Sequence, residues 1–255
     1  ERWLFKLVEC STILRLGQSW VLTADDYKAV PKFVKKKLEI QEGYGFGCDI
    51  EHFDPARFSE SENLKLRAKM EISGGDSIFV FVGRLTAFKG FLLALEAFKL
   101  LRQERADVHF LVVGNVDPQH PLDLTDLNVH DGVHHVGWQD DPAPYLAISD
   151  VMVFPSAREG MPVCVMEAIS MGIPVIGCDQ RGIREIVEHK INGFIANRCT
   201  EGILLSMQSL LAMTETKSSS TLWAKEKRDE FSRSNFFSAI LYEIERYIGA
   251  DNLVQ

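Results

Sequence analysis

The chain has 255 residues, of which 46% are hydrophobic and 25% are charged, with a formal net charge of −8. A chain of this length can bury one sizeable core, or one core and part of a second. The negative charge argues against nucleic acid as a partner, because such binding depends on neutralising phosphates. No run approaches the roughly 18 apolar residues of a membrane span, and five scattered cysteines without a C-x-x-C pair argue against disulfide frameworks and zinc sites. We therefore expect a globular cytoplasmic protein, for which peripheral contact with the cytoplasmic face of a membrane stays open.

The first 42 residues form a segment apart from the rest of the chain. Their patterns predict a helix over residues 2–16, a strand over 20–23 and a second helix over 25–37. We interpret the basic triplet of residues 35–37 as a solvated loop or helix end, with contact to a membrane surface or an acceptor phosphate as the alternative. The glycine-rich run G-Y-G-F-G, residues 43–47, then predicts a hinge over residues 43–54.

From Ser77 onward, short apolar runs alternate with helical patterns. Strands are predicted at S-I-F-V-F-V-G, V-H-F-L-V-V-G, V-H-H-V-G, V-M-V-F-P and I-P-V-I-G, with a sixth over residues 193–196, and F-L-L-A-L-E-A-F-K-L-L predicts a helix. Strands that alternate with crossover helices predict an α/β fold with a doubly wound, Rossmann-like parallel sheet. Such sheets bind ligands beyond the carboxyl ends of their strands, so one rim should be lined by the loops after Val82, Val113, Val136, Phe154 and Ile176. A serine loop over residues 218–220 should precede helices over 222–232 and 235–247.

Two carboxylates stand out in the segment E-G-M-P-V-C-V-M-E. Pro162 can occupy the first helical position, so Glu159 should lie in the loop before a helix and Glu167 one to two turns inside it. An anion docked there would meet unpaired N–H groups and the positive end of the helix dipole. The carboxylates are suited to accept hydrogen bonds from hydroxyl groups attached to that anion. A ligand with both a phosphate and sugar hydroxyls fits this pattern.

A second segment, G-R-L-T-A-F-K-G, puts Arg84 and Lys89 in the loop after the first strand of the sheet. Arginine can hold a phosphate with two parallel donors, and lysine adds a mobile charge. Together they could neutralise a diphosphate and stabilise it as a leaving group. Taken alone the two could equally be solvated loop residues, but Glu159 and Glu167 on the same rim favour a binding site.

These motifs together resemble the retaining nucleotide-sugar glycosyltransferases of group 1. The resemblance lies in G-R-L-x-x-x-K-G, in E-G-M-P-x-x-x-M-E-A about 70 residues later, and in the flanking S-D-V-M-V-F-P-S and G-I-P-V-I-G. It extends from about residue 25 to 211. G-C-D-I-E-H-F-D-P is similar to the family's entry into its C-terminal domain, although Phe46 stands where the family usually has asparagine.

The family has the GT-B fold, in which two doubly wound domains face each other across a cleft. The resemblance implies that this chain is the C-terminal half of that architecture, with C-terminal helices. Residues 1–42 would then be a remnant of the N-terminal, acceptor-side domain, and residues 43–54 the hinge. Residues 55–215 would form the nucleotide-sugar donor-binding domain, and residues 216–255 the helices that pack back on the N-terminal domain.

The resemblance also implies a role for each matching residue. Arg84 and Lys89 match the diphosphate-binding pair. Glu159 matches the glutamate that contacts hydroxyls of the transferred sugar, so these three would be the catalytic residues, whereas Glu167 would hold the ribose hydroxyls. The implied donor-binding set is Arg84, Lys89, Gln139, Asp140, Asp141, Gly160, Met161, Val163, Cys164, Val165 and Glu167. Residues 139–141 would contact the base, residues 163–165 would act through their backbone, and the thiol of Cys164 is expected to be a spectator.

The implied reaction is transfer of a hexose-type sugar, with retention, from a nucleoside diphosphate sugar, by family habit a UDP-sugar. A glycan or lipid-linked acceptor of surface polysaccharide or glycoconjugate biosynthesis is the expected partner. Because no D-x-D motif lies on the rim, we expect no metal ion and no other cofactor, with Arg84, Lys89 and the helix end in place of a cation. Metal ligation by Asp140 and Asp141 is the alternative.

Three other classes of protein compete with this interpretation. A non-catalytic nucleotide-sugar-binding module, completed by a partner chain, would share the donor site. A sugar-nucleotide epimerase of the GT-B type would share the architecture. A dinucleotide-dependent oxidoreductase needs G-x-G-x-x-G between a strand and a helix, and G-Y-G-F-G has no clear strand before it and no helix after it.

Overall fold

The computed structural model describes residues 19–21, 27–28, 30–32, 38–40, 46–122, 124, 127, 131–238 and 241–242. Near the start of the chain, β1 (Ser19–Val21) pairs in parallel with β2 (Leu38–Ile40). β1 overlaps the strand expected over residues 20–23, whereas β2 was not expected and shows that a strand does precede the glycine-rich run. The expected helix over 2–16 and the basic triplet of residues 35–37 lie outside the described residues.

The helix expected over residues 25–37 is wrong as a continuous element. Tyr27 and Lys28 are helical, but residues 30–32 form a bend and a turn. Pro31 explains the break, because proline has no N–H group to donate and disfavours helical geometry at the residue before it.

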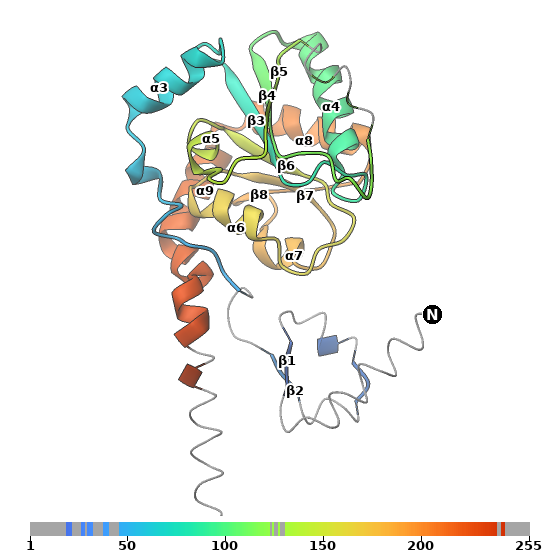
Figure 1. Cartoon of the computed structure of the whole chain (residues 1–255), viewed down its shortest axis with the longest axis vertical. Helices are drawn as coiled ribbons and strands as arrows, with labels where there is room; N and C mark the ends of the chain where they lie inside the picture. Colours follow the sequence, from blue (N-terminus) through green and yellow to red (C-terminus); the bar gives the residue numbers. More distant parts are fainter. Residues whose placement is uncertain are drawn as a thin grey trace, which may run out of the picture.

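The main body of the chain is a six-stranded parallel sheet (Figure 1). Its strands lie in the order β5-β4-β3-β6-β7-β8, and all neighbouring pairs are parallel. Their bounds are β3 (Ser77–Val82), β4 (Val108–Val113), β5 (Val133–Gly137), β6 (Val151–Phe154), β7 (Val175–Cys178) and β8 (Gly193–Ala196). All six expected strands are confirmed, although β7 begins and ends later than the run I-P-V-I-G, at Val175 and Cys178.

Helices precede the sheet, connect its strands and follow its last strand. They are α3 (Glu60–Lys69), α4 (Phe91–Glu104), α5 (Ala143–Ala147), α6 (Val163–Ser170), α7 (Ile183–Ile186), α8 (Thr200–Ala212) and α9 (Thr214–Lys227), with 3-10 turns η2 (Pro55–Arg57) and η4 (Arg228–Phe231). α4 packs against α8, whereas α6 and α7 pack on β7 (Figure 1). The predicted fold class, a doubly wound α/β sheet, is confirmed.

The core explains why the apolar runs form central strands. Every residue of β4, and all but the first of β3, is buried. Because successive strand residues point to opposite faces, such runs need cover on both sides. On one side α4 buries a stripe at helical spacing that includes Phe91 and Phe98. Both rings stack on Phe110 of β4, with centroids 6.5 and 5.3 Å away.

The order of the strands fixes where a ligand can bind. The chain moves outward from β3 through β4 to β5, returns to β6, and then moves outward in the other direction through β7 and β8. The crossover direction therefore switches between β3 and β6. Right-handed crossovers place the helices that follow these two strands on opposite faces, which opens a crevice at their carboxyl ends.

The described part of the predicted hinge, residues 46–54, is held by residues far along the chain. The Cys48 N–H group donates to the carbonyl oxygen of Phe231 (2.7 Å), and the Arg233 N–H group donates to the carbonyl oxygen of Cys48 (3.0 Å). Gly47 has a φ of 62°, and a Cβ atom there would lie 2.4 Å from the Phe231 oxygen, so this close approach requires glycine. After Gly47 the backbone forms an isolated β-bridge at Cys48 and not a helix. A dinucleotide-binding turn would need a helix there, so this part of the argument against such a turn is confirmed.

The C-terminal helices differ from those expected. The serines of residues 218–220 lie inside α9 and not in a loop. The helix expected over 222–232 is wrong at both ends, because α9 begins at Thr214 and is followed by η4 from Arg228. Serine disfavours helix interiors only weakly, and packing of α9 against α6 and α8 outweighs that preference. The backbone is again helical over residues 233–238 and 241–242. Across the described ranges, no helix is both long and apolar enough to cross a membrane.

Candidate functional site

The two sequence segments singled out above meet at the switch point of the sheet. We call residues 83–90, after β3, the Lys89 loop, and residues 155–162, after β6, the Glu159 loop. The Ala157 N–H group and the Ser156 hydroxyl both donate to the carbonyl oxygen of Phe88, at 2.7 and 3.3 Å. Gly90, with a φ of 76°, packs so closely on Pro155 that a Cβ atom would lie 2.2 Å from its carbonyl oxygen. The two loops therefore form one continuous wall.

Lys89 and Glu159, one from each loop of this wall, form an ion pair. Lys89 Nζ donates to Glu159 Oε1 at 2.7 Å, and their side chains are 25% and 10% exposed. The ammonium group also lies 5.3 Å from the ring centroid of Phe154, a cation–π distance. The structure thus brings a partly buried cation and a nearly buried carboxylate together where the fold predicts a ligand.

Arg84 is held by a residue that the sequence did not reveal. Its guanidinium donates to Asp117 Oδ2 at 2.7 Å, and while Asp117 is 6% exposed, the Arg84 side chain is 66% exposed. Hydrogen bonding from the Gln119 N–H group, together with the charge of Arg84, lowers the pKa of Asp117. An ionised, fixed carboxylate therefore anchors one edge of the guanidinium and leaves the rest facing solvent. No hydrogen bond or ion pair joins Arg84 to Lys89 or Glu159 in this arrangement.

The start of α6 offers backbone donors next to this pair. Pro162 is the N-cap of α6 and not its first helical residue, because its ψ of 111° is extended while its carbonyl oxygen accepts from the Val165 and Met166 N–H groups. The expectation for Pro162 is therefore wrong by one position. The N–H groups of Val163 and Cys164 have no hydrogen-bond partner in the described part of the chain. Unpaired donors at a helix N-terminus attract anions.

Glycine shapes the loop before α6. Gly160 and Met161, both in the implied donor-binding set, lie in the Glu159 loop. Gly182, just before α7, packs on this loop with a φ of 23°, and a Cβ atom there would lie 2.0 Å from the Gly160 carbonyl oxygen. The loop that carries Glu159 is therefore supported from β7 as well as from β3.

Glu167 lies in the second turn of α6, as predicted. Burial raises its pKa to about 7, although the positive charges of Arg233 and His52 oppose that shift. No hydrogen bond or ion pair of its carboxylate is present among the described residues. Glu167 is only partly exposed, and a carboxylate in such a position is costly unless hydroxyl or N–H donors satisfy it, so Glu167 is suited to receive hydroxyl groups of a ligand.

The implied base-contacting loop follows β5. Gln139 donates to the carbonyl oxygen of Val136 (2.8 Å), and Asp140 accepts from the indole of Trp138 (3.1 Å), whose side chain is exposed. Asp141 accepts from His52 Nε2 at 2.8 Å and from the Ala143 N–H group at 3.0 Å. Although burial opposes it, these two hydrogen bonds lower the pKa of Asp141. Asp141 thus ties His52, in the predicted hinge, to the start of α5.

Two of the predictions concern the reactivity of Cys164 and metal binding. Burial raises the pKa of the Cys164 thiol above its usual range, which keeps it protonated and suits the expected spectator role. Within the described ranges, no cluster of three or more His, Cys, Asp or Glu side chains is placed to hold a metal ion. Metal independence stays a prediction.

Sequence reasoning missed three residues that support this site. They are Asp117, which anchors Arg84; His52, which pairs with Asp141; and Arg198, whose guanidinium donates to the carbonyl oxygens of Pro155 (3.1 Å) and Ala87 (3.0 Å). Arg198 joins the Lys89 and Glu159 loops from a third segment. Asp117 and Arg198 lie outside every motif found in the sequence, and although His52 lies within G-C-D-I-E-H-F-D-P, nothing in that pattern indicates its pairing with Asp141.

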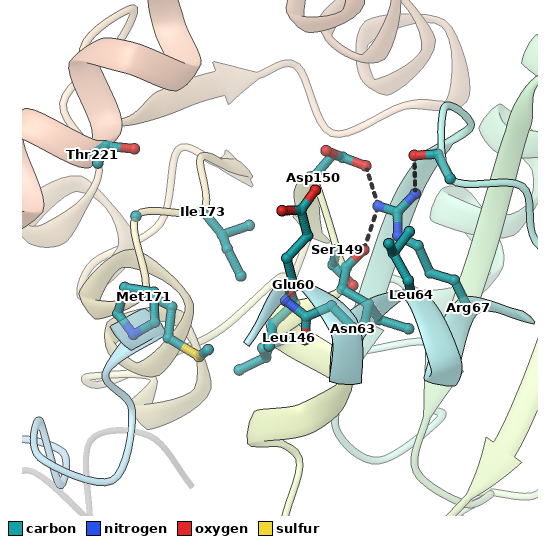
Figure 2. A pocket seen from close by; sticks show the side chains of 15 residues that line it. Glu60, Asn63, Leu64, Arg67, Leu146, Ser149, Asp150, Met171, Ile173 and Thr221 are labelled. Atoms are coloured by element: carbon teal, nitrogen blue, oxygen red, sulfur yellow. Dashed lines mark hydrogen bonds and ion pairs between the residues drawn. The ribbon is translucent and has the colours of Figure 1, made fainter. Parts of the chain in front are cut away.

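A separate cavity of about 390 Å³ lies at the opposite end of the strands, before β6 and β7 (Figure 2). Its wall is organised by Arg67, which donates to Asp150 (3.1 Å) and to the carbonyl oxygens of Ile148 (2.6 Å) and Asp76 (2.7 Å). These bonds to backbone and carboxylate occupy its guanidinium. None of the implied donor-binding residues lines the cavity, so it is distinct from the candidate site.

Comparisons with known proteins agree with the geometry. The family model described as "Glycosyl transferases group 1" matches residues 76–213, a little over half of the chain. The amylovoran biosynthesis glycosyltransferase AmsK of Erwinia amylovora is 31% identical over 163 residues, covering 59% of this chain and 39% of that protein. The UDP-Gal:alpha-D-GlcNAc-diphosphoundecaprenol alpha-1,3-galactosyltransferase of Escherichia coli is 32% identical over 154 residues, covering 58% and 39%. This chain thus spans only part of the length of the curated relatives it matches.

Solved structures agree on the fold. The crystal structure of Anabaena HepE in complex with UDP-glucose superposes with a TM-score of 0.75 at 19% identity, covering 90% of this chain and 64% of that one. This likeness confirms the expected Rossmann-like half of a GT-B architecture. Together with the family model over residues 76–213, it leads to one conclusion: the chain belongs to the glycosyltransferases of group 1.

Proposed function

We propose that this chain carries the donor site of a metal-independent enzyme that transfers a hexose-type sugar, with retention, from a UDP-sugar to a glycan or lipid-linked acceptor. We place the reaction at the cytoplasmic face of a membrane, in surface polysaccharide or glycoconjugate biosynthesis. No other cofactor is part of the proposal.

One observation carries the proposal. A cation, a carboxylate and two unpaired helix N–H groups converge at the switch point of a doubly wound sheet, on Lys89, Glu159, Val163 and Cys164. A diphosphate is suited to the cation and the N–H groups, whereas the carboxylate is suited to sugar hydroxyls. A nucleoside diphosphate sugar presents both groups in one molecule.

Each side chain then has a chemical task. Lys89 and Arg84 would stabilise the negative charge that develops on the departing diphosphate, which is the kind of electrostatic help that contributes most in many enzymes. Glu159 would hold the transferred sugar, and Glu167 the ribose. Two cations on the rim could take the role that a divalent ion plays elsewhere, which supports the metal-independent form of the proposal.

The donor and acceptor classes rest on relatives. One structural neighbour was crystallised with UDP-glucose, and the Escherichia coli relative is named for transfer from UDP-Gal to a diphosphoundecaprenol-linked sugar. Since this chain spans 39% of the length of that relative, a donor-binding module that needs a further domain or chain for transfer is the second candidate.

Calorimetric titration of the chain with a panel of nucleoside diphosphates and their sugars tests the proposal. We expect saturable binding that favours uridine, lost in Glu167→Ala and kept in the control Glu96→Ala, which removes an exposed carboxylate from α4. A module that serves only as a protein partner would show no saturable binding to any nucleotide. Product analysis with labelled UDP-glucose and a lipid-linked acceptor then separates transfer from epimerisation.

A further inference from the structure

We propose that Glu159 makes the site select the nucleotide sugar over the bare nucleoside diphosphate, and so promotes release of the diphosphate product. This inference rests on the proposed function. It concerns the competition between the Glu159 carboxylate and the ligand's diphosphate for the ammonium group of Lys89. In the structure, Lys89 Nζ donates a hydrogen bond to Glu159 Oε1 at 2.7 Å.

The position of Glu159 sets up that competition. Its side chain is 10% exposed and that of Lys89 is 25% exposed, so water screens the pair only in part. A diphosphate that contacts Lys89 must bring its negative charge close to the carboxylate. Like charges at such short range oppose each other. For a bare diphosphate, Glu159 is therefore a repulsive neighbour that also holds the cation the ligand needs.

When a sugar is attached to the diphosphate, Glu159 favours binding instead of opposing it. A carboxylate accepts hydrogen bonds but cannot donate them, whereas sugar hydroxyls can donate. When hydroxyl groups reach Glu159, they provide the partners that it loses as Lys89 turns toward the phosphate. Once the sugar has been transferred, those donors are gone and Glu159 again attracts Lys89.

Arg84 contrasts with Lys89 in this respect. Its partner Asp117 is 6% exposed and accepts from the Gln119 N–H group as well, while the Arg84 side chain is 66% exposed. The planar guanidinium has five N–H donors and can keep Asp117 while contacting a phosphate. The exchange of partners is therefore specific to the Lys89 and Glu159 pair.

The test compares the affinities of UDP and UDP-glucose for the wild-type chain and for Glu159→Gln. Glutamine has the same shape without the charge, so UDP should bind about tenfold more tightly, while UDP-glucose binds no more tightly than before. The control Glu201→Gln removes an exposed charge at the start of α8, which also follows the carboxyl end of a strand, and should change both affinities by less than about twofold.

The outcomes separate the inference from the proposed function. If the wild-type chain binds both nucleotides but the ratio of the two affinities is the same in Glu159→Gln, the inference is wrong and the donor site stands. The inference is also wrong if Glu201→Gln tightens UDP binding equally, since the effect would then be one of net charge. If the wild-type chain binds neither nucleotide, the proposed function fails and the inference fails with it.

Discussion

Gly182 packs directly on the carbonyl oxygen of Gly160, so closely that a Cβ atom on Gly182 would lie 2.0 Å from it. The φ of 23° at Gly182 is itself unfavourable for any other residue. We therefore expect Gly182→Ala to lower the free energy of unfolding by about 1–3 kcal/mol and to weaken UDP-glucose binding by displacing the Glu159 loop.

Gly160→Ala is the matched control for this prediction. A Cβ atom at Gly160 would meet nothing within 4 Å, so its effect on the free energy of unfolding should stay within about 0.5 kcal/mol. Urea denaturation of both variants provides the measurement. Equal stability of the two variants would show that the contact between these loops is not needed.

The ionised Glu167 side chain should lower the free energy of unfolding at alkaline pH. Its pKa of about 7 lies above the usual 4.5 because of burial, so the folded chain binds more protons than the unfolded chain between those values. Stability due to this group is therefore fully present below pH 4.5 and is lost as the pH rises through 7. Glu167→Gln should be more stable than wild type at pH 8, by about 1–3 kcal/mol, and equally stable near pH 4.5.

Thermal unfolding of wild type and Glu167→Gln between pH 4.5 and pH 8 measures this difference. The same variant should bind UDP more weakly at pH 8, because an amide accepts fewer hydroxyl donors than an ionised carboxylate. A difference in stability that does not change with pH would contradict the assignment of the raised pKa to burial.

The histidines of the outer strands should give a pH dependence of the opposite sign. His109 Nδ1 lies 2.9 Å from His134 Nε2, and His109 Nε2 lies 3.0 Å from Asp76 Oδ2. Burial, together with the positive charge that His109 can carry, lowers the pKa of His134 below 6.5. Below pH 6.5 the unfolded chain therefore binds more protons at this residue than the folded chain does. The free energy of unfolding should fall with the pH, by on the order of 1 kcal/mol.

Chemical denaturation between pH 7.5 and pH 5, compared between wild type and His134→Gln, isolates this contribution. The glutamine variant should lose less stability over that range, because it cannot be protonated. An identical slope in the two proteins would place the acid sensitivity elsewhere in the chain.

The sequence was informative where burial decides local structure. The runs around Val80 and Leu111 predict central strands, because a strand with apolar residues on both faces needs cover on both sides. The glycines after β3 and β4 indicate where the rim begins. Helix ends were less predictable. Pro162 caps α6 instead of beginning it, since its ψ is extended. The serines before Thr221 lie inside α9, because packing of that helix against α6 and α8 outweighs their weak local preference.

The candidate site shows the same division. Lys89 and Glu159 could be assigned to one rim because parallel strands end at the same edge of the sheet, and the structure brings their side chains together. Their supports could not be predicted. Asp117 and Arg198 reach the site from other segments, at sequence separations for which no periodicity or motif gives a signal.

The most direct test of the central claim is an amide-resolved NMR titration of the chain with UDP. The account predicts that the largest shifts occur at Val163 and Cys164, at the start of α6, and in the Lys89 loop. Asn63 and Gly172, which line the cavity at the other end of the sheet, should not move. Shifts centred on that cavity, or saturating UDP with no shift at the start of α6, would contradict it.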